Sequence, residues 1–473
     1  MLFNSMTYAV FLPVVFLLYW LLPHKLRWIL LLASSYYFYM SWNAKYVALI
    51  LTTTVVSYTC ALLLERMRSK TGRRILLLFA LIICVGILFV FKYYNWAMSS
   101  LGFIFSIKAS RVNLILPVGI SFYTFQTLGY VIDVYRSEVK AERHFGIYAT
   151  FISFFPQLVA GPIERTSNLL PQIKEEKIFD YTAASYGVRL ILWGLYKKVV
   201  IADNLALMVD SVYGDVTAHV GFRLILATLF FTFQIYCDFS GYSDIAKGSA
   251  ALLGIKLMDN FKSPYFSSSI REFWSRWHIS LSTWFRDYVY IPLGGNRVSA
   301  LRNIINTIIT FSISGLWHGA SWSFVAWGGA HGSAQVYENA FGIKKQESRN
   351  VYWIIRVIVV FLFVMFAWIF FRANSLRDAF YVIRYMMSGI RYPIQYVKSG
   401  LSFFEIDLMD GLRLILVYLL PLCVYDYCSL DHDVNRKIGE LKPLWRHLIM
   451  IGVVVVILLF GYYGQSTFVY FQF

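Results

Sequence analysis

The stretch Ile75–Tyr94, ILLLFALIICVGILFVFKYY, decides the fold, because its twenty residues contain a single charged side chain, Lys92. A helix that crosses a membrane needs about 20 consecutive, mainly apolar residues. Comparable runs recur along the whole chain, in which 58% of the 473 residues are hydrophobic and 15% are charged. A soluble globular domain has about 25% charged residues. The sequence therefore predicts an all-α, polytopic integral membrane protein.

The formal net charge of +17 is concentrated in short loops between the apolar runs. Examples are Glu65–Arg74 (ERMRSKTGRR), directly before the quoted stretch, and Arg136–His144 (RSEVKAERH). Such loops are typical of the cytoplasmic side of membrane proteins. The basic charge thus indicates topology and contact with membrane lipid, and no nucleic-acid partner is expected.

About 11–12 transmembrane helices are predicted around a central funnel, all within one membrane domain that covers residues 1–473. An apolar segment broken by Pro and Gly, Ile152–Pro162, is typical of a re-entrant element, and the Trp- and Arg-rich segment Arg271–Tyr290 of an interfacial amphipathic helix. The expected spans are 8–23, 28–41, 44–64, 75–94, 112–134, 183–201, 222–237, 303–317, 320–341, 352–371, 411–429 and 447–464.

The basic loops also predict the orientation of the chain. When they are placed inside, both termini fall outside, and residues 465–473 form an extracytoplasmic tail. The segment Arg372–Lys398 also carries basic residues yet falls outside in this scheme. We find no internal repeat of the kind that marks many transporters.

Two histidines stand in unusual surroundings. His318 lies at the break between two apolar runs, and an ionisable residue inside a membrane is costly and usually functional. A neutral imidazole that bridges two helix ends is the alternative. His278 lies within the amphipathic segment, where a chemical and a packing role are equally open. His331 could orient His318 or be a buried structural histidine.

No metal centre and no bound cofactor are predicted. The cysteines have neither CxxC spacing nor a histidine at metal-ligand spacing, and they suit small core positions: Cys60, Cys84, Cys237, Cys423 and Cys428.

Several blocks of the sequence together resemble a known family. They are LPVGISFYTFQ (116–126), FPQLVAGPIER (155–165), QIYCDFSGYSD (234–244), FWSRWHISL (273–281), Trp317-His318-Gly319, FFRA (370–373) and FVYFQF (468–473). The chain resembles the membrane-bound O-acyltransferase family, and within it the bacterial branch of alginate O-acetyltransferases and related exopolysaccharide-acetylating proteins. The D-alanylating members that modify teichoic acid share several of these blocks. They typically lack the C-terminal block and rely on a separate small peptide instead.

The resemblance implies that His318 is the catalytic residue, that His278 is a second functional position, and that a funnel opens to the cytoplasm for the acyl donor. It also implies a bacterial inner membrane location and an extracytoplasmic, serine-esterase-like (SGNH-type) acetyltransferase partner, alongside the machinery that makes and exports a polysaccharide. Which polysaccharide is acylated stays open.

Transfer of an acyl group from a thioester to a hydroxyl needs a base, and a buried, neutral imidazole suits that task. The developing oxyanion could be bound by the amides near Gly315 and Gly319, or by the side chains of Asn296 and Trp317. The phosphates of acetyl-CoA, the expected donor, could be met by three arginines that positive-inside topology explains equally well: Arg271, Arg276 and Arg286.

The C-terminal tail offers an acyl acceptor, Tyr470. Six extended residues reach roughly 20 Å, whereas half of a hydrocarbon core is about 15 Å. Tyr470 could thus meet a histidine at the middle of the membrane, accept the acyl group and pass it outwards; an interfacial aromatic anchor is the alternative. Rival functions are transfer of D-alanyl or longer acyl groups, a transporter or flippase, and a scaffold for a polysaccharide synthase.

Overall fold

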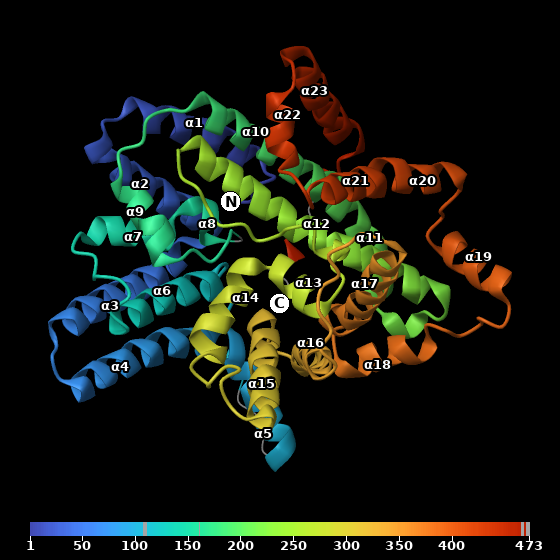
Figure 1. Cartoon of the computed structure of the whole chain (residues 1–473), viewed down its shortest axis with the longest axis horizontal. Coiled ribbons are helices and arrows are strands. Elements are labelled where there is room, and N and C mark those ends of the chain that lie inside the picture. Colours follow the sequence, from blue (N-terminus) through green and yellow to red (C-terminus); the bar gives the residue numbers. More distant parts are fainter. Residues whose placement is uncertain (107–110, 160, 465–467, 470–473) are drawn as a thin grey trace. The chain divides into compact units, whose positions relative to one another are not determined.

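The computed structural model describes residues 1–106, 111–159, 161–464 and 468–469, and helices are the only regular secondary structure in this part of the chain (Figure 1). The chain divides into two compact units: Met1–Ile191 with Tyr242–Asp259, and Leu192–Gly241 with Asn260–Phe473. Two helices, α10 (Tyr181–Leu195) and α12 (Phe222–Leu252), run from one unit into the other.

In the first unit, α3, α4 and α6 pack against one another (Figure 1), and α7 packs against α2 and α9. The helices of this unit are α1 (Met6–Leu21), α2 (His24–Asn43), α3 (Val47–Arg66), α4 (Lys70–Leu88), α5 (Tyr94–Phe105), α6 (Ile120–Tyr135), α7 (Phe145–Ser153), α8 (Phe155–Leu158) and α9 (Thr166–Lys174), with a 3₁₀ turn η1 (Ala44–Tyr46) and a π-helical turn η2 (Phe89–Tyr93).

The second unit holds both unusual histidines. Its helices are η3 (Tyr196–Ala202, a π-helix), α11 (Asp203–Tyr213), η4 (Val216–Ala218), η5 (Pro264–Phe266), α13 (Ile270–Arg276), α14 (Ile279–Phe285), η6 (Arg286–Tyr290), α15 (Ala300–His318), α16 (Trp322–Ala340), α17 (Val351–Arg372), α18 (Leu376–Tyr385), α19 (Pro393–Phe403), α20 (Leu408–Arg413), η7 (Leu414–Leu419), α21 (Leu420–Cys428), α22 (Val434–Glu440) and α23 (Pro443–Phe460).

The prediction of an all-α membrane protein is confirmed. Six helical stretches of the described residues are long and apolar enough to cross a membrane: His24–Arg66, Lys70–Phe105, Phe222–Leu252, Val351–Arg372, Leu408–Cys428 and Pro443–Phe460. Each of the other predicted spans also falls on a helix, but α1 is short, with 16 residues, and α15 and α16 are more polar. In α23 no residue is buried, as expected of a helix that faces lipid.

Two predicted spans have different bounds in the structure. The span 112–134 begins as helix only at Ile120, after Gly119 adopts a left-handed conformation with φ 74°. The span 222–237 continues as α12 to Leu252, because the polar side chains that follow Cys237 are buried inside the protein instead of forming a loop. Their polarity made the sequence look like a helix end.

Candidate active site

His318 is the last residue of α15, and close packing between α15 and α16 fixes its position. At Gly315 an added Cβ would lie 2.1 Å from the carbonyl oxygen of Phe324, and at Gly328 it would lie 2.2 Å from that of Phe311. Only glycine permits the two backbones to approach so closely. The helix pair therefore provides a rigid base for the imidazole of His318.

Aromatic side chains surround His318, which is 2% exposed. The ring centroids of Trp317, Trp327 and Phe371 lie 4.9 Å, 5.1 Å and 5.2 Å from the centroid of its imidazole. These rings come from α15, α16 and α17. The site is consequently a water-poor pocket of rings, in which electrostatic interactions are stronger than in water.

His278 lies beside this pocket, at a break between α13 and α14. Its ring centroid lies 6.3 Å from that of His318 and 5.8 Å from that of Trp317, so the structure brings together three of the residues singled out from the sequence. His278 has φ 43° and ψ 53°, a left-handed conformation that is rare for residues other than glycine and is concentrated at functional sites.

The segment Arg271–Tyr290 is accordingly not one interfacial helix. It is divided into α13, α14 and η6, and Phe273, Trp277 and His278 are fully buried. Burial lowers the pKa of His278 to about 3, because a charged imidazole is disfavoured away from water. His278 is therefore neutral at physiological pH.

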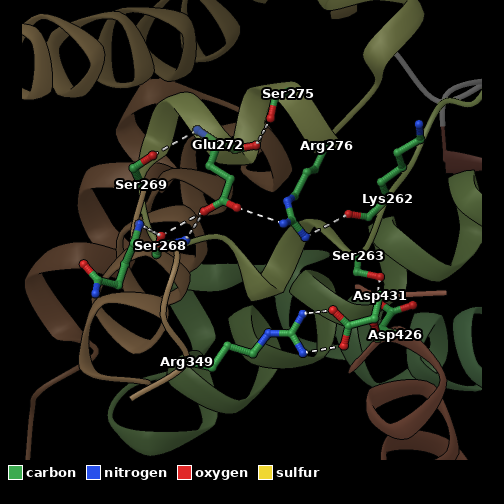
Figure 2. Close-up of polar contacts among 11 residues, drawn as sticks. Lys262, Ser263, Ser268, Ser269, Glu272, Ser275, Arg276, Arg349, Asp426 and Asp431 are labelled. Carbon is green, nitrogen blue, oxygen red and sulfur yellow. Dashed lines mark hydrogen bonds and ion pairs between the residues drawn. The ribbon is translucent and has the colours of Figure 1, made fainter. Parts of the chain in front are cut away.

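Carboxylates hold α13 in place. Glu272 accepts hydrogen bonds from the amide and hydroxyl of Ser268, at 2.8 Å and 2.9 Å, and from Arg276 at 2.8 Å (Figure 2). Glu338 of α16 accepts hydrogen bonds from the first two amides of the helix, those of Ile270 at 2.6 Å and Arg271 at 3.0 Å. Both carboxylates therefore fix the helix that leads into His278.

Asn260 supports the other side of the break. Its carbonyl oxygen accepts a hydrogen bond from the amide of Ile279 at 3.0 Å, and its side-chain oxygen accepts one from the hydroxyl of Ser280 at 2.6 Å. Asn260 is 1% exposed, so these bonds are shielded from water. The left-handed turn at His278 is thus fixed from both sides.

The imidazole of His331 is also buried, and its Nδ1 accepts a hydrogen bond from the indole N–H of Trp274 at 3.3 Å. The ring of Trp327 packs against both His331 and His318, with centroid distances of 5.0 Å and 5.1 Å. His331 therefore supports the wall of the pocket through Trp327.

The predicted donor-binding residues Asn296, Arg271, Arg276 and Arg286 are at least partly exposed. Arg271 and Arg286 are exposed; the first donates to the side chain of Asn339 and the second pairs with Asp287 at 2.8 Å. Arg276 is partly exposed and held by Glu272, as described above. Asn296 is exposed in the turn after η6. Unlike the imidazoles of His278 and His318, these four polar side chains are thus not buried.

Tyr470 lies outside the described residues, but the two residues before it are described and buried. Phe468 is fully buried, and its ring centroid lies 5.8 Å from that of Phe239. Phe239 in turn packs edge-on against His278, at a centroid distance of 4.6 Å. The C-terminal segment therefore reaches the neighbourhood of the two histidines.

Comparison with known proteins identifies the family to which this chain belongs. The family model for membrane-bound O-acyltransferases matches residues 94–376, which include both histidines and the helices that hold them. The chain belongs to the membrane-bound O-acyltransferase family. It is therefore a multi-pass membrane enzyme that transfers acyl groups to hydroxyls, as the resemblance predicted.

Two relatives named for O-acetylation cover most of its length, and a D-alanylating relative covers about half. A probable alginate O-acetylase of Pseudomonas putida is 35% identical over 100% of both chains. A peptidoglycan O-acetyltransferase of Helicobacter pylori is 36% identical over 82% of this chain and 80% of its own. A teichoic acid D-alanyltransferase of Streptococcus thermophilus is 33% identical over 48% of this chain and 58% of its own.

Sequence reasoning missed several residues that shape the site. Glu338 and Asn260 act through partners far away in the chain, so no local pattern reveals them. Asp238 and Phe239 lie within a quoted family block, yet no role was assigned to them. Trp327 is one of several aromatic residues of α16, and no local pattern distinguishes it from the others.

Proposed function

We propose that this O-acyltransferase moves an acetyl group from cytosolic acetyl-CoA to Tyr470, and that the group then passes to a polysaccharide outside the inner membrane. The relatives named for alginate and peptidoglycan O-acetylation, cited above, support acetyl over D-alanyl transfer. They cover at least 80% of this chain, whereas the D-alanyltransferase covers 48%.

One observation carries the proposal: Phe468 is buried against Phe239, which packs against His278. Tyr470 follows only two residues later, and consecutive Cα atoms are about 3.8 Å apart. We propose that the hydroxyl of Tyr470, two residues along the chain from Phe468, meets the acyl group beside the two histidines.

In the proposed reaction, His318 removes the proton from the phenolic hydroxyl of Tyr470 as the oxygen attacks the thioester carbonyl. The C–S bond then breaks, and the imidazolium returns the proton to the thiolate of coenzyme A. The carbonyl ends of a helix carry partial negative charge, so the C-terminal end of α15 stabilises the transient positive charge on His318. General-base catalysis of this kind contributes about 10²–10⁴-fold.

The exposed cations Arg271 and Arg286, with Arg276, are proposed to attract the phosphates of the donor at the cytoplasmic side. These arginines are at least partly exposed, so they suit the binding of a mobile, charged ligand. Arginines held in a buried ion pair would suit it less well.

The acetyl group on Tyr470 is then proposed to move to the serine hydroxyl of an extracytoplasmic SGNH-type partner, which delivers it to a hydroxyl of the glycan. An aryl ester suits this relay because phenoxide is a better leaving group than an alkoxide. The tyrosyl oxygen recovers a proton from the serine, so Tyr470 is ready for the next cycle.

The test is intact mass spectrometry of the C-terminal peptide after the purified protein has been incubated with acetyl-CoA labelled in the acetyl group. A labelled acetyl adduct on Tyr470 is expected in the wild type and in His432→Ala, an exposed histidine that serves as control, and is expected to be absent in His318→Ala.

Two results would count against the proposal. Undiminished polysaccharide acetylation in Tyr470→Phe, which keeps an aromatic anchor and removes the hydroxyl, would exclude the relay. Substrate transport without any cleavage of acetyl-CoA would favour a transporter.

A further inference from the structure

The second unit contains a cluster of charged side chains that is almost fully buried. Lys198 of η3 forms ion pairs of 2.7 Å with both Asp203 of α11 and Asp238 of α12, and the exposed fractions of the three side chains are 1%, 3% and 2%. Lys197, next in the chain, donates to Ser240 at 2.8 Å. Charged groups are rarely buried in this way unless they are paired and serve a specific purpose.

Both lysines of this cluster lie on the π-helix η3, a rare element that is frequent at functional sites. The carbonyl oxygen of Val199, between Lys198 and the rest of η3, accepts a hydrogen bond from the amide of Tyr462 at 2.8 Å. Asn204 adds a bond from its side-chain amide to the carbonyl oxygen of Phe460, at 2.9 Å. The chain that leaves α23 is therefore fixed through its backbone to η3 and α11.

A second fixed point follows seven residues later. The amide of Val469 donates to Oδ2 of Asp238 at 2.7 Å, in a bond that involves a charged acceptor and a residue that is 3% exposed. The other carboxylate oxygen of Asp238 pairs with Lys198, which supplies the opposing charge. Asp238 thus joins the charged cluster to the residue directly before Tyr470.

From this geometry we infer that Asp238 is a positioning residue, which holds the C-terminal segment in the acyl-transfer site through the backbone amide of Val469. Both fixed points use main-chain groups, so they set the path of the segment irrespective of its side chains. That Asp238 thereby presents an acyl acceptor rests on the proposed function, whereas the anchoring itself does not.

Hydrogen–deuterium exchange of the full-length protein in detergent tests the anchor without any chemistry. A hydrogen bond to a charged group contributes about 1.5–3 kcal/mol, which corresponds to roughly 10–100-fold slower exchange. We expect Asp238→Ala, which removes both acceptor oxygens, to accelerate exchange of the Val469 amide by at least about tenfold. Asp410→Ala, the same change in a partly exposed carboxylate of α20, is expected to leave it unaltered. Equal exchange in wild type and Asp238→Ala would overturn the inference.

A second pair of variants keeps the test decisive if Asp238→Ala does not fold. Val469→Pro removes the amide hydrogen from the C-terminal segment, and Val469→Ala keeps it. We expect Val469→Pro to reduce acetylation of Tyr470 at least about tenfold more than Val469→Ala. His318-dependent hydrolysis of acetyl-CoA by water is expected to change less than about threefold, because the donor side is untouched.

The combination of Asp238→Ala and Val469→Pro is expected to lose no more acetylation than the more severe single variant, because both remove the same bond. Strictly multiplicative losses would contradict the inference. If the wild type carries no acetyl group on Tyr470 while exchange at Val469 still depends on Asp238, the proposed function fails and the anchor stands.

Discussion

Replacement of Glu338 should uncouple the helix that leads into His278 from the rest of the site. The carboxylate of Glu338 is 6% exposed and accepts hydrogen bonds from the amides of Ile270 and Arg271, the first two residues of α13. Glu338→Gln keeps one acceptor oxygen and replaces the other by an N–H group, whereas Glu338→Ala removes both acceptors.

The losses in the free energy of unfolding of the two variants should stand in a predictable ratio. Each hydrogen bond to a carboxylate contributes about 1.5–3 kcal/mol, and a buried amide that loses its acceptor bears the full cost of its desolvation. Glu338→Gln should therefore lower the free energy of unfolding by about 1.5–3 kcal/mol, and Glu338→Ala by about 3–6 kcal/mol. Since α13 ends two residues before His278, acyl transfer should decline in the same order.

Thermal unfolding in detergent, followed by tryptophan fluorescence, measures the loss of stability. Transfer of a labelled acetyl group measures the loss of activity. The control is Glu440→Ala, which removes an exposed carboxylate of α22 that pairs with Lys437. A loss of Tm in Glu338→Ala no larger than in Glu440→Ala, or an unchanged transfer rate despite a large loss of Tm, would refute the reasoning.

Three further predictions concern the buried titratable groups. His318→Ala should reduce acyl transfer at least about 100-fold while the Tm of the purified protein falls by only a few degrees; a loss of activity that merely follows unfolding would contradict a catalytic role. His278→Asn should keep the left-handed turn, whereas His278→Val should lower stability by a further ~1–2 kcal/mol, because a β-branched residue is strained there; equal Tm values would disprove this. Burial raises the pKa of Glu164 from 4.5 to about 7. Its contribution to stability is therefore complete below pH 4.5 and is lost as the pH rises through 7. The loss in the free energy of unfolding is about 3 kcal/mol at most. The Tm of wild type should therefore fall more between pH 5 and pH 8 than that of Glu164→Gln, and parallel curves would exclude this effect.

The positions of the helices could be predicted because lipid and protein interior both select apolar residues over a length that the sequence displays directly. Ile75–Tyr94 is an example, since it coincides with α4 and the π-helical turn η2. The burial of His318, a costly ionisable group within an apolar run, could be predicted for the same reason. Asn296 and the three arginines also carry predicted roles; their side chains are at least partly exposed, and the roles stay predictions.

The break at His278 could not be predicted, because a left-handed residue other than glycine has no local signature. Its conformation depends on Glu338 and Asn260, which contact the flanking helices from distant points of the chain. The extension of α12 beyond Cys237 was missed for a related reason. Polar residues normally end a transmembrane helix, and only the tertiary structure shows that Asp238 is paired with Lys198 inside the protein.

The three parts of the site are held by separate supports, and this separation has a consequence for catalysis. His318 depends on the glycine contacts of α15 with α16, His278 on Glu338 and Asn260, and the C-terminal segment on Asp238. In the proposed relay between the two sides of the membrane, the acceptor must leave while the base stays in place. Because the bond from Val469 to Asp238 involves neither histidine, the C-terminal segment can be released without disturbing His318, the proposed base. Variants of Asp238 should therefore alter acceptor delivery, and variants of Glu338 the chemistry itself.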